Sequence, residues 1–525
     1  MGRARWTSTS CLRSLCEVLG LSTEVEADVG RGLAGTHLIG LLDTAISEAR
    51  DRVRSALLNS RFGWPDARIT VSLSPASLPK RGSIFDLAIA IAVLGAAGAV
   101  PAHRIAQPFF LGELGLDGRV RPVRGVLPAA LAAARAGART IVVPSLNATE
   151  AALVPELTVV PAESLAELVE RLREDEPRRL PVAIAGPSPA PGDAPRAGES
   201  DGEDGRPRLD LRDVAGQATG RKALEVCAAG GHNLWMLGPP GTGKTMLAER
   251  LPTLLPPLER EQALEVTAIH SVAGTLPPDR PLLDRPPFVA PHHTATVAAV
   301  VGGGSGLVRP GAVSLAHQGV LFLDEAPEFS TGVLDSLRQP LESGQVTVAR
   351  AAGTVTFPAQ FMLVLAANPC PCGAAGMPGH RCRCTPTARR RYLARLSGPL
   401  LDRIDVKVRV ARATRAELMA DRHVAESSTT VAERVRSARE RALNRLAGTS
   451  WRNNAEVGSA ALHTDFRLPV RALTPLHRGL DLGTLSARGV DRVLRVAWTI
   501  ADLAGKDRPD ESDTSAALAM WLGAD

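Results

Sequence analysis

Short apolar runs alternate with amphipathic stretches along the first third of the chain. Strand-like patterns occur at Glu24–Val29, Arg68–Ser74 and Ala138–Pro144. Helical periodicity covers about Asp43–Asn59, and an apolar helix is expected after Asp86. Because strands and helices alternate in this way, residues 1–175 are predicted to form one compact α/β domain.

A change of composition separates this part from the rest of the chain. Residues 176–207 are rich in Pro, Gly and acidic residues and have little periodic apolar content. This composition is typical of a flexible linker.

Residues 208–411 show the pattern of a parallel sheet. Short, almost continuous apolar runs lie at Asn233–Leu237, Gly319–Leu323 and Phe361–Ala367. Strands that are buried on both faces have such runs. Two alternating runs, Gln345–Arg350 and Thr354–Pro358, flank a Gly-containing turn and predict a β-hairpin.

From residue 412 to residue 525 the periodicity is helical. Helices are expected at Val431–Leu446, about Arg471–Leu482, Arg488–Leu503 and Thr514–Leu522. One apolar stripe of the third helix predicts a face that packs in a core. The stripe consists of Val490, Val493, Leu494, Ala497, Ile500 and Leu503.

A glycine-rich loop joins the strand at Asn233–Leu237 to a predicted helix at Lys244–Leu255. Glycines let successive backbone N–H groups point inward, where they and the helix N-terminus hold a polyphosphate. Lys244 is predicted to reach the β- and γ-phosphates of ATP, and the Thr245 hydroxyl to ligate Mg²⁺. The loop matches G-x-x-x-x-G-K-[ST] with Gly238, Pro239, Pro240, Gly241, Thr242, Gly243, Lys244 and Thr245.

Two carboxylates follow the apolar run at Gly319–Leu323. We expect Asp324 to hold Mg²⁺ through its water shell and Glu325 to polarise the attacking water. The alternative is a buried strand that ends in a solvated acidic turn. Together with the phosphate loop, the two acids predict ATP hydrolysis.

Four cysteines, Cys370, Cys372, Cys382 and Cys384, lie within fifteen residues. Four thiolates suit one tetrahedral Zn²⁺ ion. The C-x-C spacing is tighter than the usual C-x₂-C, so a zinc site and free thiols that merely pack are both open interpretations.

Composition argues against a membrane-spanning protein and against a disulfide-linked one. The chain has seven cysteines and no N-terminal apolar segment, and its most apolar run, Leu87–Val100, is too short to span a bilayer. We therefore expect a cytoplasmic protein without a membrane partner, whose cysteines serve as thiols or metal ligands. The net charge of +6 permits nucleic-acid binding without demanding it.

Three N-terminal stretches resemble the YifB/ComM family of magnesium-chelatase-like proteins. They are GLAGTHLIGLLDTAISEARDRVR at 32–54, SPASLPKRGSIFD at 74–86 and LGELGLDGRVRPVRG at 111–125. The resemblance implies an N-terminal fold similar to ribosomal protein S5 and the Lon protease domain, followed by a P-loop AAA+ core and a C-terminal helical lid.

The similarity to Lon raises the hypothesis of a peptidase with a Ser–Lys pair. In this sequence Ile84 stands at the position of the serine, with Ser83 one residue earlier, and Leu127 stands at that of the lysine. Apolar side chains cannot replace a nucleophile or its base. We therefore expect a scaffold or partner-binding domain without peptidase activity.

The core carries further phrases of the same family: RPPFVAPHH at 285–293, GGGSG at 302–306 and RPGAVSLAH at 309–317. His292 and His293 within the first phrase are candidate metal ligands. Adjacent histidines point in different directions, which favours a structural or pore-loop role.

The resemblance also implies roles for residues outside the two phosphate-site motifs. Asn368 matches the sensor that positions the lytic water, although a turn residue before a proline is the alternative. Arg403, or as second choice Arg395, would reach the γ-phosphate held by a neighbouring subunit. Arg488 matches a second sensor, directed toward the γ-phosphate from the lid.

The implied assembly is a homo-hexamer that acts on DNA, in branch migration or helicase activity on recombination intermediates during natural transformation. Arg350, near the hairpin tip, and Arg389–Arg391 would contact phosphate backbones, or would be solvated charges. One alternative is a magnesium-chelatase-type motor with a protein or porphyrin-insertion client, but those subunits lack an S5-like domain. Another is a non-enzymatic or peptidase-like regulator, which the complete motifs and the apolar Ile84 and Leu127 disfavour.

Overall fold

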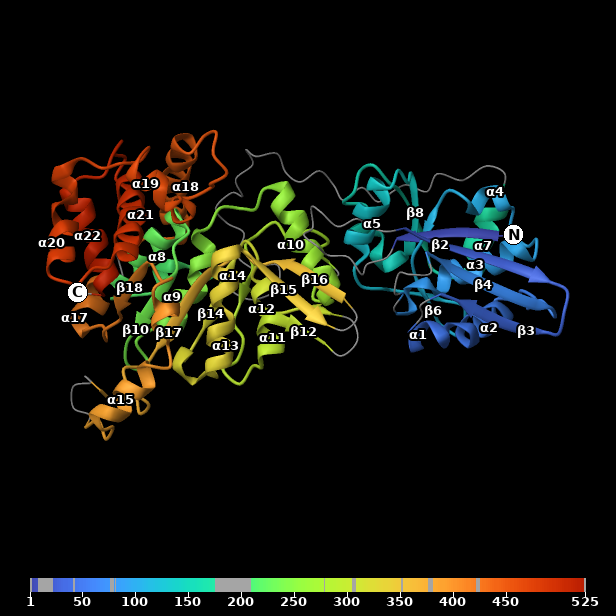
Figure 1. The fold of residues 1–525 in the computed structure, drawn as a ribbon, viewed down its shortest axis with the longest axis horizontal. Coiled ribbons are helices and arrows are strands. Elements are labelled where there is room, and N and C mark those ends of the chain that lie inside the picture. The colour runs from blue at the N-terminus through green and yellow to red at the C-terminus, as the bar shows by residue number, and fades with distance from the viewer. Residues whose placement is uncertain are drawn as a thin grey trace.

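The computed structural model describes residues 2–7, 22–40, 43–75, 80, 82–174, 209–277, 279–304, 308–350, 353–375, 381–421 and 425–523. The predicted linker at 176–207 lies outside the described residues. Three parts lie in a row along the long axis of the molecule: an N-terminal α/β part, a central parallel sheet and C-terminal helices (Figure 1).

A seven-stranded sheet in the order β3-β4-β2-β1-β5-β8-β9 forms the N-terminal part. The strands β1, β2 and β4 pair antiparallel, and the other neighbours pair parallel. Their bounds are β1 Gly2–Thr7, β2 Ser22–Gly30, β3 Gly35–Ile39, β4 Arg68–Ser74, β5 Phe109–Phe110, β8 Thr140–Pro144 and β9 Thr158–Ala162.

One apolar helix, α3 (Asp86–Ala96), packs across β1 and β2 and is buried from Asp86 to Leu94. Burial raises the pKa of Asp86 to about 6, although Arg52 donates to its carboxylate at 2.9 Å. The predicted helix at about Asp43–Asn59 is divided into α1 and α2. The helices and the small β6–β7 ribbon are α1 Thr44–Ser47, α2 Ala49–Asn59, α4 Ala102–Ile105, β6 Glu113–Leu114, β7 Val120–Arg121, α5 Val126–Arg135, α6 Ala148–Ala151 and α7 Leu165–Arg173.

The central sheet is parallel, in the order β11-β14-β17-β10-β18. Val320, Phe322 and Val364 face a core shared with the C-terminal helices, whereas Leu321 and Leu323 face a second core on the other side. Burial on both faces explains the continuous apolar runs. The bounds are β10 Leu234–Leu237, β11 Phe288–Val289, β14 Val320–Leu323, β17 Met362–Ala367 and β18 Val406–Arg409.

The helix predicted at Lys244–Leu255 is shorter than expected. It is α-helical only over α9 (Lys244–Arg250) and continues as a 3₁₀ turn, Leu251–Leu254, that contains Pro252. Proline lacks the N–H that would continue the α-helix. The other elements of this part are α8 Ala218–Gly230, α10 Arg260–Ala273, α11 Val297–Val301, β12 Gly302–Gly303, β13 Arg309–Pro310, α12 Ala312–Leu315, α13 Thr331–Ser336, α14 Arg338–Ser343, α15 Pro386–Leu393 and α16 Gly398–Leu401.

The predicted hairpin is formed by β15 (Gln345–Arg350) and β16 (Gly353–Pro358), which pair antiparallel. Among the C-terminal helices, α21 buries Val493, Leu494 and Ala497 of the predicted stripe. These helices are α17 Arg415–Asp421, α18 Ser428–Arg445, α19 Ser459–His463, α20 Thr474–Asp481, α21 Ala487–Leu503 and α22 Glu511–Leu522. No helix among the described residues carries an apolar stretch long enough to cross a bilayer.

Candidate nucleotide-binding site

The phosphate loop follows the carboxyl end of β10 in the middle of the sheet. The Gly238 amide donates to Ala367 O of β17 at 3.1 Å, which joins the loop to the neighbouring strand. Gly241 and Gly243 have φ values of +73° and +87°, and the space around a Cβ at either position is open. Both positions need glycine, and together they leave an open cradle in front of the loop amides.

Lys244 connects the loop to the predicted sensor. Its ammonium donates to Gly238 O at 2.7 Å, to Pro239 O at 2.8 Å and to Asn368 Oδ1 at 3.2 Å. Burial lowers the pKa of this lysine. The structure therefore brings Lys244 and Asn368 together at the carboxyl ends of β10 and β17.

The predicted Mg²⁺ ligands also meet here. Thr245 Oγ1 donates to Asp324 Oδ2 at 2.8 Å, and the Glu325 amide donates to Asp324 Oδ1 at 2.9 Å. Glu325 has a φ of +50°, a left-handed conformation that is uncommon for residues other than glycine. Such backbone strain is found most often at functional sites.

These residues fit ATP with Mg²⁺. The loop amides and Lys244 would hold the phosphates, and Thr245 and Asp324 would hold the ion. Glu325 stands beside them with a half-exposed carboxylate.

The sequence analysis named His293 as a candidate metal ligand, or a structural or pore-loop residue, but did not predict its contact with Glu325. His293 Nδ1 lies 3.5 Å from Glu325 Oε2, and the rings of His292 and His293 lie 4.1 Å apart. The position of His293 shortly after strand β11 could have indicated this contact, because the carboxyl ends of parallel strands meet at one edge of a sheet.

Arg403 lies at the other edge of the sheet. Its backbone oxygen accepts from Asn233 Nδ2 at 2.9 Å, and Asn233 precedes β10, whereas the phosphate loop follows it. A four-residue strand separates the two edges by about 13 Å. The Arg403 guanidinium binds Glu342 of α14 and Pro399 O.

Arg488 is exposed at the start of α21. One turn later on this helix, Arg492 binds Asp405 at 2.9 Å, immediately before β18 begins. Arg395 is different, because it lies 3.6 Å from Glu328, three residues after Glu325. Within one chain, Arg395 thus lies close to the segment that follows the acidic pair, whereas Arg403 lies at the opposite edge of the sheet.

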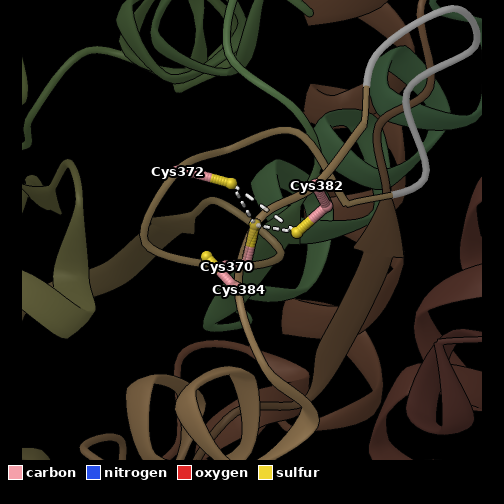
Figure 2. A group of neighbouring side chains, drawn as sticks. All are labelled: Cys370, Cys372, Cys382 and Cys384. Atoms are coloured by element: carbon pink, nitrogen blue, oxygen red, sulfur yellow. Dashed lines mark hydrogen bonds between the residues drawn. The ribbon is translucent and has the colours of Figure 1, made fainter.

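The four clustered cysteines converge in the loop after β17 (Figure 2). All four ligand atoms lie within 4.8 Å of one another. Three of the sulfur pairs lie at 3.4 to 3.6 Å, close to the roughly 3.8 Å that a tetrahedral zinc–thiolate site requires. A hydrogen bond from the Ala374 backbone lowers the pKa of Cys372 to about 6.

The positions that correspond to a peptidase pair belong to the apolar core. Ile84 and Leu127 are both buried, and Ser83 Oγ binds Glu113 rather than a lysine. The side chains at these positions offer neither a nucleophile nor a base.

Comparison with known proteins agrees with this geometry. The family described as "Magnesium chelatase, subunit ChlI" matches residues 210–418, "Subunit ChlI of Mg-chelatase" matches 25–147, and "Magnesium chelatase, subunit ChlI C-terminal" matches 425–520. An uncharacterised protein of Mycobacterium tuberculosis is 51% identical over 95% of this chain and 96% of its own length.

Two further relatives carry names. Competence protein ComM of Haemophilus influenzae is 41% identical over 92% of this chain and 91% of its own length. The chain belongs to the YifB/ComM family of magnesium-chelatase-like AAA+ proteins. YifB of Escherichia coli, which is uncharacterised, is likewise 41% identical, over 93% of this chain and 90% of its own.

Membership of the YifB/ComM family indicates which reaction the site supports. The protein is an AAA+ ATPase whose cofactors are ATP and Mg²⁺. Its fold is α/β, with an S5/Lon-protease-like N-terminal part, a parallel-sheet core and a helical C-terminal part.

Proposed function

We propose that this ATPase works as a hexameric ring that moves on DNA and drives branch migration or strand separation in recombination intermediates. The position of Arg403, at the edge of the sheet opposite the phosphate loop of its own chain, is the observation that supports a ring. If Arg403 acts on ATP, a subunit whose Arg403 lies away from its own phosphate loop needs a neighbouring subunit to complete each site. A closed ring of identical subunits supplies that neighbour at every site.

Each residue of the site has a role in this proposal. Glu325 polarises the attacking water, Asn368 positions it, and Lys244 with the loop amides balances charge on the phosphates. Bound Mg²⁺ neutralises charge on the phosphate oxygens. Arg403 of a neighbouring subunit adds a positive charge, and Arg488 acts as a second sensor from the same side.

The proposed DNA contact rests on charge. The segment Arg381–Arg395 contains six arginines and no acidic residue, and its helix α15 projects from the body of the molecule in Figure 1. Arg390 and Arg391 are exposed on that helix. A clustered basic surface is the electrostatic footprint of phosphate-backbone binding. Arg350, at the end of β15, is a second proposed DNA contact. A role in DNA uptake or recombination is also consistent with the name of the relative, competence protein ComM.

We further propose that Cys370, Cys372, Cys382 and Cys384 hold one structural Zn²⁺. Four thiolates that close a tetrahedron without a position for water match structural rather than catalytic zinc. Metal analysis of the purified protein, with titration of its free thiols, measures this directly.

The deciding experiment is the steady-state ATPase rate with single-stranded, duplex and four-way-junction DNA, at low and moderate salt. We expect forked or junction DNA to stimulate hydrolysis most, with weaker stimulation as salt rises. Hydrolysis that is indifferent to every DNA would favour the alternative, a magnesium-chelatase-type motor with a protein or porphyrin-insertion client.

A pair of matched double variants locates the contact. Arg390→Ala with Arg391→Ala should weaken DNA binding and reduce the slope of log K against log salt by about 2. Arg471→Ala with Arg478→Ala removes the same charge from exposed C-terminal positions and should leave the slope unchanged. If the two double variants have equal salt slopes, α15 does not contact DNA as proposed.

A further inference from the structure

The four-cysteine loop lies between the ATP site and the projecting basic helix. It begins two residues after Asn368, whose side chain contacts Lys244 at 3.2 Å. Its last cysteine, Cys384, directly precedes Thr385, which caps α15 by accepting from the Ala388 amide at 3.2 Å. The loop therefore connects the sensor strand β17 to α15.

The same loop touches the phosphate loop directly. Gly373, between Cys372 and Cys382, packs so closely on Pro240 that a Cβ would lie 2.6 Å from Pro240 Cγ. Gly373 also has a φ of +73°, so both its conformation and its contact require glycine. A displacement of Gly373 would therefore also displace Pro240 of the phosphate loop.

A second contact returns from α15 to the sensor. Tyr392 is buried, and its hydroxyl interacts electrostatically with the Asn368 backbone. Burial, with nearby Glu328 and Glu325, raises the pKa of this tyrosine to about 12, so it stays neutral. Both ends of the cysteine loop thus lie close to Asn368: Cys370 follows it by two residues, and Tyr392 of α15 interacts with its backbone.

We propose that metal bound at the four cysteines sets the rate of ATP hydrolysis by fixing Asn368 and Pro240. This rests on the zinc site proposed above. A tetrahedral centre ties Cys370, after β17, to Cys384, before α15, and so fixes the two ends of this segment relative to each other. Without the metal, Asn368 and the phosphate loop lose that support, and small misplacements of catalytic groups cost large factors in rate. The cysteines are positioning residues and take no part in the chemistry.

The part of this coupling that acts on binding is reciprocal, which makes it measurable on the intact chain. If bound metal favours the nucleotide-binding arrangement, bound nucleotide must favour the metal by the same factor. We expect ATP with Mg²⁺ to tighten Zn²⁺ binding by about fivefold or more, measured at equilibrium as the Zn²⁺ lost to a chromogenic chelator. Lys244→Ala, which should not hold the nucleotide, should show no such protection.

Metal removal tests the consequence for turnover. The chelated wild-type chain, and the double variant Cys382→Ser with Cys384→Ser, should lose about 10- to 100-fold in kcat with a smaller change in KM. Cys16→Ser, outside the described residues, controls for the loss of a thiol. Addition of Zn²⁺ should restore the chelated wild type and not the double variant.

Gly373→Ala separates the contact from the metal. All four cysteines remain, so zinc content should be unchanged, while pressure on Pro240 should raise KM for ATP about tenfold. Gly448→Ala is the matched control, because Gly448 has a φ of +83° and nothing within 4 Å of its Cβ position. It should leave both kcat and KM unchanged.

The outcomes distinguish the two proposals. Protein without zinc, with four freely titratable thiols, overturns the metal site itself. The protein could instead contain zinc, with nucleotide having no effect on the Zn²⁺ lost to the chelator and chelation having no effect on kcat. That result supports the metal site and overturns the coupling. Nucleotide-protected zinc together with the loss of kcat supports both.

Discussion

Glu325 combines chemistry with an unusual backbone. Its left-handed φ turns the chain immediately after β14, so that Asp324 faces Thr245 while the Glu325 carboxylate faces His293. Two adjacent acids thereby serve different partners. This division of roles is what a metal-holding and a water-polarising carboxylate require.

Glu325→Gln is the prediction at the residue scale. Glutamine has the same size but cannot accept a proton, so kcat should fall by about 10² to 10⁴ while ATP still binds. Phosphate release and equilibrium nucleotide binding measure the two effects separately. Glu440→Gln, an exposed change on α18, should alter neither. If Glu325→Gln turns over ATP near the wild-type rate, a group other than Glu325 polarises the attacking water.

At the scale of elements, β18 and α21 are joined by a buried ion pair. Burial opposes ionisation of Asp405, but Arg492 and His232 outweigh it and lower its pKa from 3.8 to about 2. A lowered carboxyl pKa contributes stability that is fully present above the unfolded value and is lost as pH falls through the folded value. The shift corresponds to about 2 kcal/mol, lost between about pH 4 and pH 2.

Arg492→Gln should therefore destabilise the fold most at neutral pH. It removes the arginine partner of a buried carboxylate, which keeps only His232 and the Asn233 amide, and such a loss costs about 3 to 5 kcal/mol in free energy of unfolding. Below pH 4 Asp405 becomes protonated in the variant and the difference from the wild type should shrink. Denaturant unfolding at pH 7 and pH 3.5 measures this. Arg471→Gln, whose side chain is 91% exposed beside Glu511, should cost less than about 1 kcal/mol at either pH.

On the scale of the whole molecule, the N-terminal part and the central sheet share a core. Ala268, Ile269 and Val272 of α10 belong to the same apolar cluster as the N-terminal sheet. Ser271 on this helix also hydrogen bonds to the buried Glu150, and Arg260 donates to Leu153 O at 3.0 Å. The S5-like N-terminal part is thus packed on the central part through α10.

Subunits that cannot hydrolyse ATP alone should restore activity together. Lys244→Ala protein keeps Arg403, and Arg403→Ala protein keeps an intact phosphate loop, so a mixed ring contains some complete sites. We expect each variant to lose most ATPase activity and the mixture to recover a measurable fraction at intermediate ratios. A mixture of Lys244→Ala with Glu325→Gln protein is the control, because no site in it is complete. Absence of rescue at every ratio would argue against action of Arg403 between subunits.

Much of this protein could be predicted from the sequence because the signals are local. The phosphate loop, the acidic pair and the hairpin are contiguous in the chain. The apolar runs identify the strands because both faces of the central sheet are buried. Lys244, Thr245, Asp324 and Asn368 are brought to one edge of that sheet, as parallel strands require.

Other features depend on which strands become neighbours, and only the tertiary structure decides that. Lys244 and Asn368 are separated by 124 residues, and Gly373 meets Pro240 only because β10 pairs with β17. The contact of His293 with Glu325 likewise needs β11 beside β14. Motif spacing says which groups a chain carries. The order of the sheet determines which groups share an edge, and so separates Arg403 from the phosphate loop of its own chain.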